Sequence, residues 1–247
     1  MRKLFLVPLF LLLSFIPPLD FKASQLKNAR VKTAFLEKEK LLSELLKSKN
    51  ILPDQLQIFL RVFKSEKLIE VWAKNKQDKN YLLLHNFSIC ASSGELGPKR
   101  SIGDGQVPEG FYFIERFNPA SNFYLSLGLS YPNVSDRKLS KAKNLGGDIF
   151  IHGSCVTIGC MPITDDKIKE LYALAVMAYS NGETKIPVHL FPMRLGDENL
   201  KILKSKNSSA TQLIHFWENL KTGYDYFETK KQLPKISIKA DGYYSFQ

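Results

Sequence analysis

The first long regular pattern lies in residues 26–50. Apolar side chains recur there at spacings of three and four, with lysine and glutamate between them. That period is typical of an amphipathic helix. We therefore predict a helix, ending before Pro53 and Asp54, that either packs on the core or tethers it to a membrane. Its apolar positions are Val31, Ala34, Phe35, Leu41, Leu42, Leu45 and Leu46.

A different pattern runs from about residue 58 to residue 153. Apolar residues alternate with polar ones, and glycines and prolines separate the alternating runs. A period of two predicts half-buried strands joined by turns. The clearest example runs from Tyr81 to Ile89. The other predicted strands are Lys67–Trp72, Phe111–Phe117, Phe123–Leu129 and Asp148–His152.

Helical periodicity returns after Pro162. A run with Ile168, Leu171 and Leu174 on one face ends at Asn181-Gly182, and acidic residues at its start favour a helix N-terminus there. A strand is predicted at Ile186–Phe191. A second helix is predicted after Ser208-Ser209, and an aromatic-rich tail fills residues 224–247. The fold class is therefore mainly β in the middle of the chain and α+β overall.

The N-terminus has the pattern of an export signal. Arg2 and Lys3 precede an uncharged apolar run, Leu4–Ile16, which is short for a membrane span but typical of a secretory signal. No clean cleavage site follows it, so residues 1–20 are either a cleaved signal peptide or a retained anchor. We predict an exported protein of the periplasm or cell envelope, with peripheral membrane contact through the N-terminus as an option.

The formal net charge is +11. Lysine and arginine are spread along the chain rather than clustered with aromatic residues, which argues against a nucleic-acid partner. A basic exported protein suits anionic partners such as wall polymers. A solvated lysine-rich surface is the simpler alternative.

Three cysteines are present: Cys90, Cys155 and Cys160. An odd number leaves at least one thiol unpaired in an exported chain. For Cys155 we favour burial as a small apolar residue over a disulfide with Cys90 or with Cys160. The unpaired thiol requires an explanation, and catalysis is one.

The segment from His152 to Cys160 could supply that catalysis. A thiol attacks as its thiolate, and a histidine eight residues upstream at a strand end could fold back to act as its base. The backbone N–H groups of Gly159, Cys160 and Ile158 are candidates to bind an acyl oxyanion. We expect Gly153, Ser154 and Thr157 to support the loop. The alternative to catalysis is that His152 is a core histidine with its hydrogen bonds satisfied, and that Cys155 and Cys160 pack as small apolar residues.

These residues carry a resemblance to a known family. The run His152-Gly153-Ser154-Cys155-Val156-Thr157-Ile158-Gly159-Cys160-Met161-Pro162 resembles the active-site signature of the L,D-transpeptidase (YkuD-type) catalytic domain. Ile158 stands where most members have a second histidine. In this respect the chain resembles the YafK-like subgroup. Further stretches that agree with that subgroup are Arg61-Val62-Phe63-Lys64, Gly97-Pro98-Lys99, Gly103-Asp104, Pro108-Glu109-Gly110, Tyr131-Pro132-Asn133, Phe216-Trp217 and Gly223-Tyr224-Asp225.

The resemblance implies an enzyme with a β-sandwich-like core and a catalytic cleft. It implies Cys160 as the nucleophile, His152 as the base and no metal or organic cofactor. The implied substrate is a diaminopimelate-type peptidoglycan stem peptide, and the thioester passes to an amine, to a wall-linked protein or to water. Transpeptidase and hydrolase therefore both remain open, because YafK-like members include a hydrolase that detaches wall-linked protein.

The resemblance also suggests how the chain is divided. We predict a helical N-terminal segment at 21–54, a catalytic domain at 55–195 and a C-terminal helical extension at 196–247 that packs on the core. Candidates to hold substrate carboxylates are Arg194, Lys99 and Arg100, although ordinary surface charges are the simpler interpretation. His85, His189 and His215 are expected to be structural.

Two other functions compete with this interpretation. A sortase-like protein transpeptidase would use Arg194 beside the same histidine and cysteine. A metal-binding or redox module would use His152, Cys155 and Cys160 as ligands, but it needs a fourth ligand and the spacing fits no standard zinc knuckle.

Overall fold

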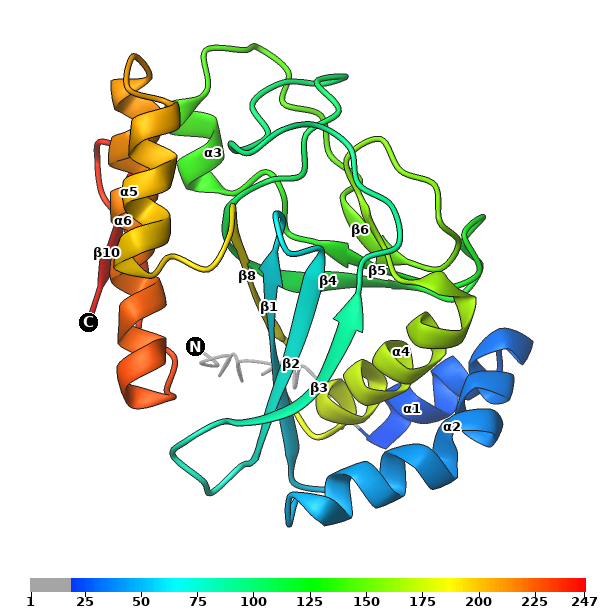
Figure 1. The fold of residues 1–247 in the computed structure, drawn as a ribbon. Coiled ribbons are helices and arrows are strands. Elements are labelled where there is room, and N and C mark those ends of the chain that lie inside the picture. Colours follow the sequence, from blue (N-terminus) through cyan, green and yellow to red (C-terminus); the bar gives the residue numbers. More distant parts are fainter. Residues whose placement is uncertain (1–18) are drawn as a thin grey trace, which may run out of the picture.

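A computed structural model describes residues 19–247. It confirms a mixed α+β fold (Figure 1). The strands of the main sheet are β1 (Leu56–Phe63), β2 (Leu68–Asn75), β3 (Leu82–Ser88), β4 (Gly110–Asn118), β5 (Ser126–Leu129), β6 (Phe150–His152), β7 (Met161–Pro162) and β8 (Pro187–Phe191).

These eight strands form one sheet in the order β3-β2-β1-β8-β4-β5-β6-β7. Most neighbours are antiparallel, but β1 and β8 run parallel, as do β6 and β7. The β-sandwich-like core that the resemblance implied is therefore corrected in one respect: a single sheet curls, and helices rather than a second sheet cover it. In Figure 1 β1, β2 and β3 cross the direction of β4 and β5, which shows the curl.

The curl brings the two ends of the sheet together. The backbone N–H of Cys90, just after β3, donates to the carbonyl of Pro162 in β7 at 2.9 Å. β3 and β7 are the first and last strands of the sheet. An edge strand has unpaired backbone groups, and this hydrogen bond pairs one group from each edge.

Helix α4 (Thr164–Ser180) packs on the sheet, and α1 (Leu19–Leu26) and α2 (Ala29–Ser48) pack on α4 (Figure 1). The predicted periodic face of α2 is confirmed where Val31, Ala34, Leu42 and Leu46 are buried. Leu41, which we placed on that face, is 44% exposed. The face packs on α4, so the core-packing alternative is the one that the structure supports.

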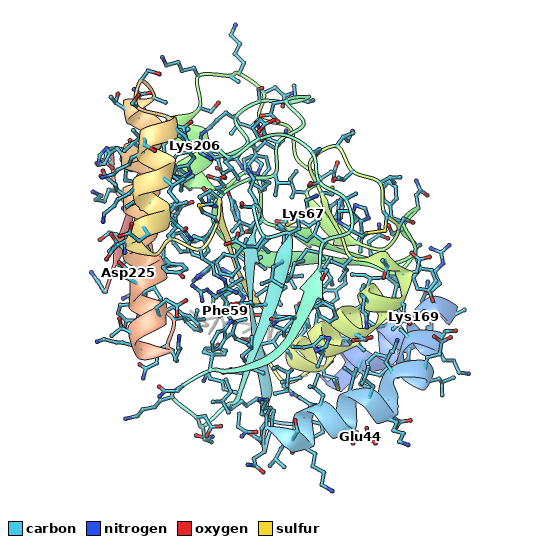
Figure 2. All side chains as sticks on the ribbon, viewed as in Figure 1. Glu44, Phe59, Lys67, Lys169, Lys206 and Asp225 are labelled. Carbon is cyan, nitrogen blue, oxygen red and sulfur yellow. A yellow bond between two sulfur atoms is a disulfide. The ribbon has the colours of Figure 1, made fainter. Side chains whose placement is uncertain are left out.

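The C-terminal part forms a second apolar cluster on the other side of the sheet. It contains α5 (Asp197–Lys206), α6 (Thr211–Lys230) and a hairpin of β9 (Ile236–Ile238) and β10 (Tyr244–Phe246). Figure 2 shows side chains filling the space between α6 and the sheet, where Phe59 of β1 meets Phe227 of α6 with ring centroids 4.9 Å apart.

Several short elements escape the sequence prediction. The sequence patterns did not predict helix α3 (Val134–Leu139), strand β7 or the β9–β10 hairpin, and α5 was predicted only as part of a helical extension at 196–247. No helix in the described part of the chain is both long and apolar enough to cross a bilayer. Residues 1–18 of the predicted signal or anchor lie outside the described residues.

A buried carboxylate joins the C-terminal part to the sheet. Glu109 is fully buried and accepts hydrogen bonds from Lys64 Nζ (3.0 Å), Gly97 N (2.7 Å) and Trp217 Nε1 (2.8 Å). A buried charge is tolerated only when its oxygens are satisfied. The Trp217 indole supplies one of these donors from α6.

We therefore predict that Trp217→Phe destabilises the protein by about 2 kcal/mol, because it keeps an aromatic ring but removes a donor from a buried carboxylate. The free energy of unfolding from urea titration measures this loss. Tyr243→Phe is the control: its ring is half-buried in the same cluster, and it should change stability by less than about 0.5 kcal/mol. Equal effects of the two substitutions would contradict the prediction.

Candidate active site

The loop after β6 folds back on its own strand. β7 pairs in parallel with β6, so that Met161 lies opposite Ile151 and Pro162 lies opposite His152. Cys160 then falls beside Phe150, whose N–H donates to the Cys160 Sγ at 3.4 Å. The loop therefore places Cys160 next to the strand that ends at His152, although in residues 19–247 no hydrogen bond joins the sulfur to the imidazole.

The Cys160 thiol is half-buried and is the one free cysteine of the three. Besides the Phe150 N–H, its sulfur lies 3.5 Å from the carbonyl of Asp148. Burial raises the pKa of the thiol above its ordinary value, because the charged form is poorly solvated there. The Phe150 hydrogen bond and the Lys99 charge oppose this shift only partly. The resting sulfur is therefore a thiol at neutral pH, and it needs a base to become the attacking thiolate.

His152 is buried, with 1% of its surface exposed. Its Nδ1 lies against the carbonyl of Gly153. A carbonyl can only accept, so this contact assigns the proton to Nδ1 and leaves the Nε2 lone pair free to take a proton. Burial lowers the pKa of the imidazole, which keeps the ring neutral near pH 7 and leaves Nε2 unprotonated.

Thr157 organises the return of the loop. Its Oγ1 accepts from the N–H of Cys160 at 2.8 Å and of Gly159 at 3.2 Å, and it donates to the Cys160 carbonyl at 2.8 Å. Two of the three N–H groups expected to bind an oxyanion are therefore engaged by a side chain. Ile158, the third, has a side chain that is 89% exposed.

The first turn of α4 also holds the loop. Asp165 Oδ1 accepts from the N–H of Ser154 at 2.8 Å. Gly153 lies between the Asp165 carboxylate and the backbone of Phe123. A Cβ added to Gly153 would lie 2.7 Å from the Phe123 carbonyl. Only glycine fits such a gap. The start of α4 thus holds the loop through a carboxylate, and its first residue, Thr164, comes four positions after Cys160.

A disulfide joins Cys90 to Cys155. Burial of Cys155 as a small apolar residue, which we favoured, is wrong: the residue is exposed and covalently paired. The alternative pairing with Cys90 is the one observed. This bond attaches the middle of the 153–159 loop to the chain that leaves β3.

Two residues that the sequence did not single out shape the surroundings of His152, one by direct contact and one through a loop. The Phe123 ring lies on the imidazole, with centroids 4.5 Å apart and planes 31° apart. The loop that carries Phe123 is held by Arg30 of α2, whose Nη1 donates to the carbonyls of Ser121 (2.6 Å) and Tyr124 (2.8 Å). The N-terminal helix therefore acts on the surroundings of the candidate base through a neighbouring loop.

Comparison with known proteins identifies the family of this chain. The family model described as L,D-transpeptidase catalytic domain (YkuD) matches residues 57–189. This chain belongs to the L,D-transpeptidase family. The YafK protein of Escherichia coli (strain K12) is 36% identical over 183 residues, which cover 73% of this chain and 70% of that protein.

Among solved structures, the helical cell shape determining protein Pgp2 from Campylobacter jejuni aligns with a TM-score of 0.44 and 18% identity, over 75% of this chain and 74% of that one. Mycobacterium tuberculosis L,D-transpeptidase 1 aligns with a TM-score of 0.28 and 11% identity, over 55% and 62%.

The other candidate residues of this L,D-transpeptidase family member lie in structural contacts. Arg194 pairs with Glu70 at 2.5 Å, and buried Lys99 pairs with Asp104 at 2.6 Å. Arg100 pairs with Asp136 at 2.9 Å and borders a cavity. As substrate-binding residues all three stay predictions.

The remaining histidines have ordinary packing partners. His189 is buried between the rings of Phe59 and Phe111, with centroids 4.4 and 4.6 Å away. His85 lies 3.7 Å from Glu170, and His215 stacks on Tyr243.

The raised pKa of Cys160 predicts how the thiol titrates. We expect alkylation of Cys160 by iodoacetamide, followed by mass spectrometry, to rise with pH and to reach half its maximal rate at a higher pH than free N-acetylcysteine in the same buffer. The reason is that burial disfavours the thiolate. A midpoint well below that of the free thiol would instead indicate a preformed thiolate–imidazolium pair.

The disulfide predicts a stability cost. Because its cysteines are separated by 65 residues, the chain-entropy model gives about 4 kcal/mol, and losses of about 2–4 kcal/mol are typical. The double variant Cys90→Ser/Cys155→Ser should lose this amount in urea unfolding, and wild type with a thiol reductant should match it. Cys160→Ala, the control, should cost less than about 1 kcal/mol. An unchanged double variant would refute the prediction.

Proposed function

We propose that this protein is an exported cysteine acyltransferase that acts on peptidoglycan stem peptides, with Cys160 as nucleophile and His152 as base. The observation that carries the proposal is the return of the loop: it puts a half-buried thiol beside the strand that ends at a neutral imidazole whose Nε2 is free. Membership of the L,D-transpeptidase family supports the same assignment.

In the first step the Cys160 thiol loses its proton to His152 Nε2 as sulfur attacks a peptide carbonyl carbon. The C–S bond forms and the carbonyl oxygen becomes an oxyanion. Collapse of this intermediate breaks the C–N bond, and the imidazolium returns the proton to the leaving amine. Concerted proton transfer suits a pair that rests neutral, because neither partner is charged before attack.

The oxyanion needs N–H donors. The N–H groups of Gly159 and Cys160 can serve only after leaving Thr157 Oγ1, whereas the N–H of Ile158 makes no hydrogen bond among the described residues. We assign the Ile158 N–H as the first donor to the oxyanion. The N–H groups of Gly159 and Cys160 would become available as further donors if their hydrogen bonds to Thr157 Oγ1 broke.

In the second step an amine or water attacks the thioester and gives a proton to His152. The C–S bond breaks and the thiol re-forms with that proton. An amine acceptor makes the enzyme a transpeptidase, and water makes it a hydrolase that could release a wall-linked protein. We place transpeptidation first and hydrolysis second.

Export to the periplasm or envelope fits this substrate. The Cys90–Cys155 disulfide supports it, because disulfides persist in oxidising compartments. The same bond weakens the metal-binding alternative, since it removes the Cys155 thiolate from the proposed ligand set of His152, Cys155 and Cys160.

Incubation with purified peptidoglycan fragments, with mass spectrometry of the products, tests the proposal. Crosslinked dimers indicate transpeptidation, and trimmed stems or released protein indicate hydrolysis. Cys160→Ala should lower the rate by about 1000-fold or more, and His152→Ala by about 100-fold or more.

His85→Ala is the matched control, because His85 lies in β3 and contacts Glu170; its rate should stay within about twofold of wild type. Circular dichroism checks that each variant is folded. Product formation by folded Cys160→Ala at the wild-type rate would eliminate the nucleophile, and absence of any product with wild type would eliminate the activity.

A further inference from the structure

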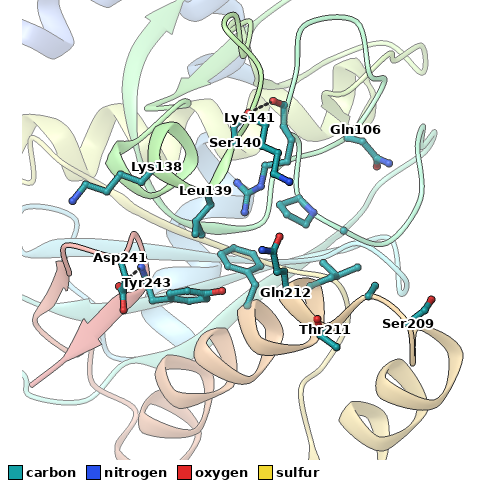
Figure 3. Close-up of a pocket in the computed structure, with 16 residues that line it drawn as sticks. Gln106, Lys138, Leu139, Ser140, Lys141, Ser209, Thr211, Gln212, Asp241 and Tyr243 are labelled. Carbon is teal, nitrogen blue, oxygen red and sulfur yellow. Dashed lines mark hydrogen bonds between the residues drawn. The ribbon is translucent and has the colours of Figure 1, made fainter.

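The C-terminal extension and the catalytic domain border an open cavity of about 800 Å³ (Figure 3). Its walls come from the 97–106 loop, from the end of α3 and the residues after it, from the start of α6 and from the β9–β10 turn. Neither Cys160 nor His152 lines it. A volume of this size suits a short peptide.

The cavity shares a wall with the active site. Gln106 lines the cavity, and its carbonyl lies against Gly159 of the catalytic loop, 3.0 Å from an added Cβ. Lys99, whose charge acts on the Cys160 thiol, stands between two further lining residues, Pro98 and Arg100. The 97–106 loop therefore lies between the cavity and the segment that carries the thiol, and it contacts both.

The lining has more positive than negative charge. Lys141 is exposed and makes no ion pair among the described residues, and Lys138 donates only to backbone carbonyls, those of Lys239 and Ala240. Asp241, the one carboxylate of the lining, is compensated by Lys239 at 3.7 Å. Two lysine charges thus have no carboxylate partner at this cavity.

The start of α6 adds to this potential. Thr211, Gln212 and Leu213 line the cavity, and their backbone N–H groups have no hydrogen-bond partner in the part of the chain that the structure describes. These N–H groups at the first turn of a 20-residue helix favour an anion. These N–H groups add to the positive potential of Lys138 and Lys141, which come from a different part of the chain.

The floor of the cavity is apolar. Phe216 lies under the guanidinium of Arg100 at 4.9 Å, and Leu139, Leu213 and Tyr243 complete the surface. Figure 3 shows Lys138 and Lys141 on one side of the cavity and the start of α6 on the other. Cations above an apolar floor suit a ligand with carboxylates on aliphatic stems.

We infer that this cavity binds a carboxylate-bearing peptide segment of the wall substrate, remote from the bond that reacts with Cys160. The inference rests on the proposed function, and it adds a second contact area formed by the C-terminal extension. Binding energy gained away from the reacting atoms can position the scissile carbonyl at the thiol.

The test measures equilibrium binding to the full chain with Cys160→Ala, so that no chemistry occurs. The probes are soluble stem peptides, the same peptides with amidated carboxylates, and peptide-free glycan strands. We expect the stem peptides to bind, and we expect Lys141→Glu to weaken their affinity by about tenfold, since a charge-assisted contact is replaced by repulsion.

Lys206→Glu is the matched control. Lys206 is exposed at the end of α5, outside the cavity, and its substitution changes the net charge equally. Its effect should stay within about twofold. Equal effects of the two variants, equal affinity for amidated peptides, tighter binding of glycan strands or no binding at all would each overturn the inference.

Product assays with intact Cys160 separate the two proposals. Normal turnover by Lys141→Glu at low peptide concentration would overturn the cavity assignment and leave the acyltransferase standing. Lys141-dependent binding without any product from wild type would support the cavity and eliminate the acyltransferase.

Discussion

The meeting of the two sheet edges is the constraint from which the active site follows. A backbone hydrogen bond from Cys90 to Pro162 and a disulfide from Cys90 to Cys155 join the chain after β3 to β7 and to the catalytic loop. A two-residue strand such as β7 is too short to hold its own position. With its outer edge tied to the end of β3, it holds Cys160 beside β6.

Burial then decides the chemistry that this geometry can perform. It disfavours charge on both partners, so it raises the pKa of the Cys160 thiol and lowers that of His152. A neutral pair avoids the cost of an ion pair in a poorly solvated site. It also keeps the thiol less reactive toward small electrophiles until a substrate carbonyl arrives.

The segments before and after residues 57–189, which the family model matches, both support loops near the candidate active site. Arg30 in α2 fixes the loop whose Phe123 lies on His152, and Trp217 in α6 binds the buried Glu109 beside the 97–106 loop. Both contacts join residues about ninety or more positions apart. The catalytic domain is therefore supported from two opposite sides of the sheet.

Much of this could be predicted from local patterns, and the rest depends on distant contacts. Alternation identified β2, β3 and β4, and helical spacing identified α2, α4 and α6, because each buries one regular face. The strand order could not be predicted, since the parallel pairing of β1 with β8 joins residues more than a hundred positions apart. The periodicity therefore could not correct the sandwich-like core that the family resemblance implied.

Some features of the candidate site could likewise be predicted from local sequence, and others could not. His152 and Cys160 could be nominated from the sequence because their spacing lies within one loop and their run has a family signature. The partner of Cys155 could not be derived from spacing alone. Phe123 and Arg30 gave no local signal, because an aromatic residue in a strand pattern and an arginine in an amphipathic helix are both ordinary.

The disulfide has a further consequence for oxidative damage. With Cys90 and Cys155 bonded to each other, no thiol within the chain can condense with a sulfenic acid formed on Cys160. Repair of that oxidised sulfur must then come from an external reductant. The chemistry proposed for Cys160 would then depend on thiol-reducing proteins of the same compartment.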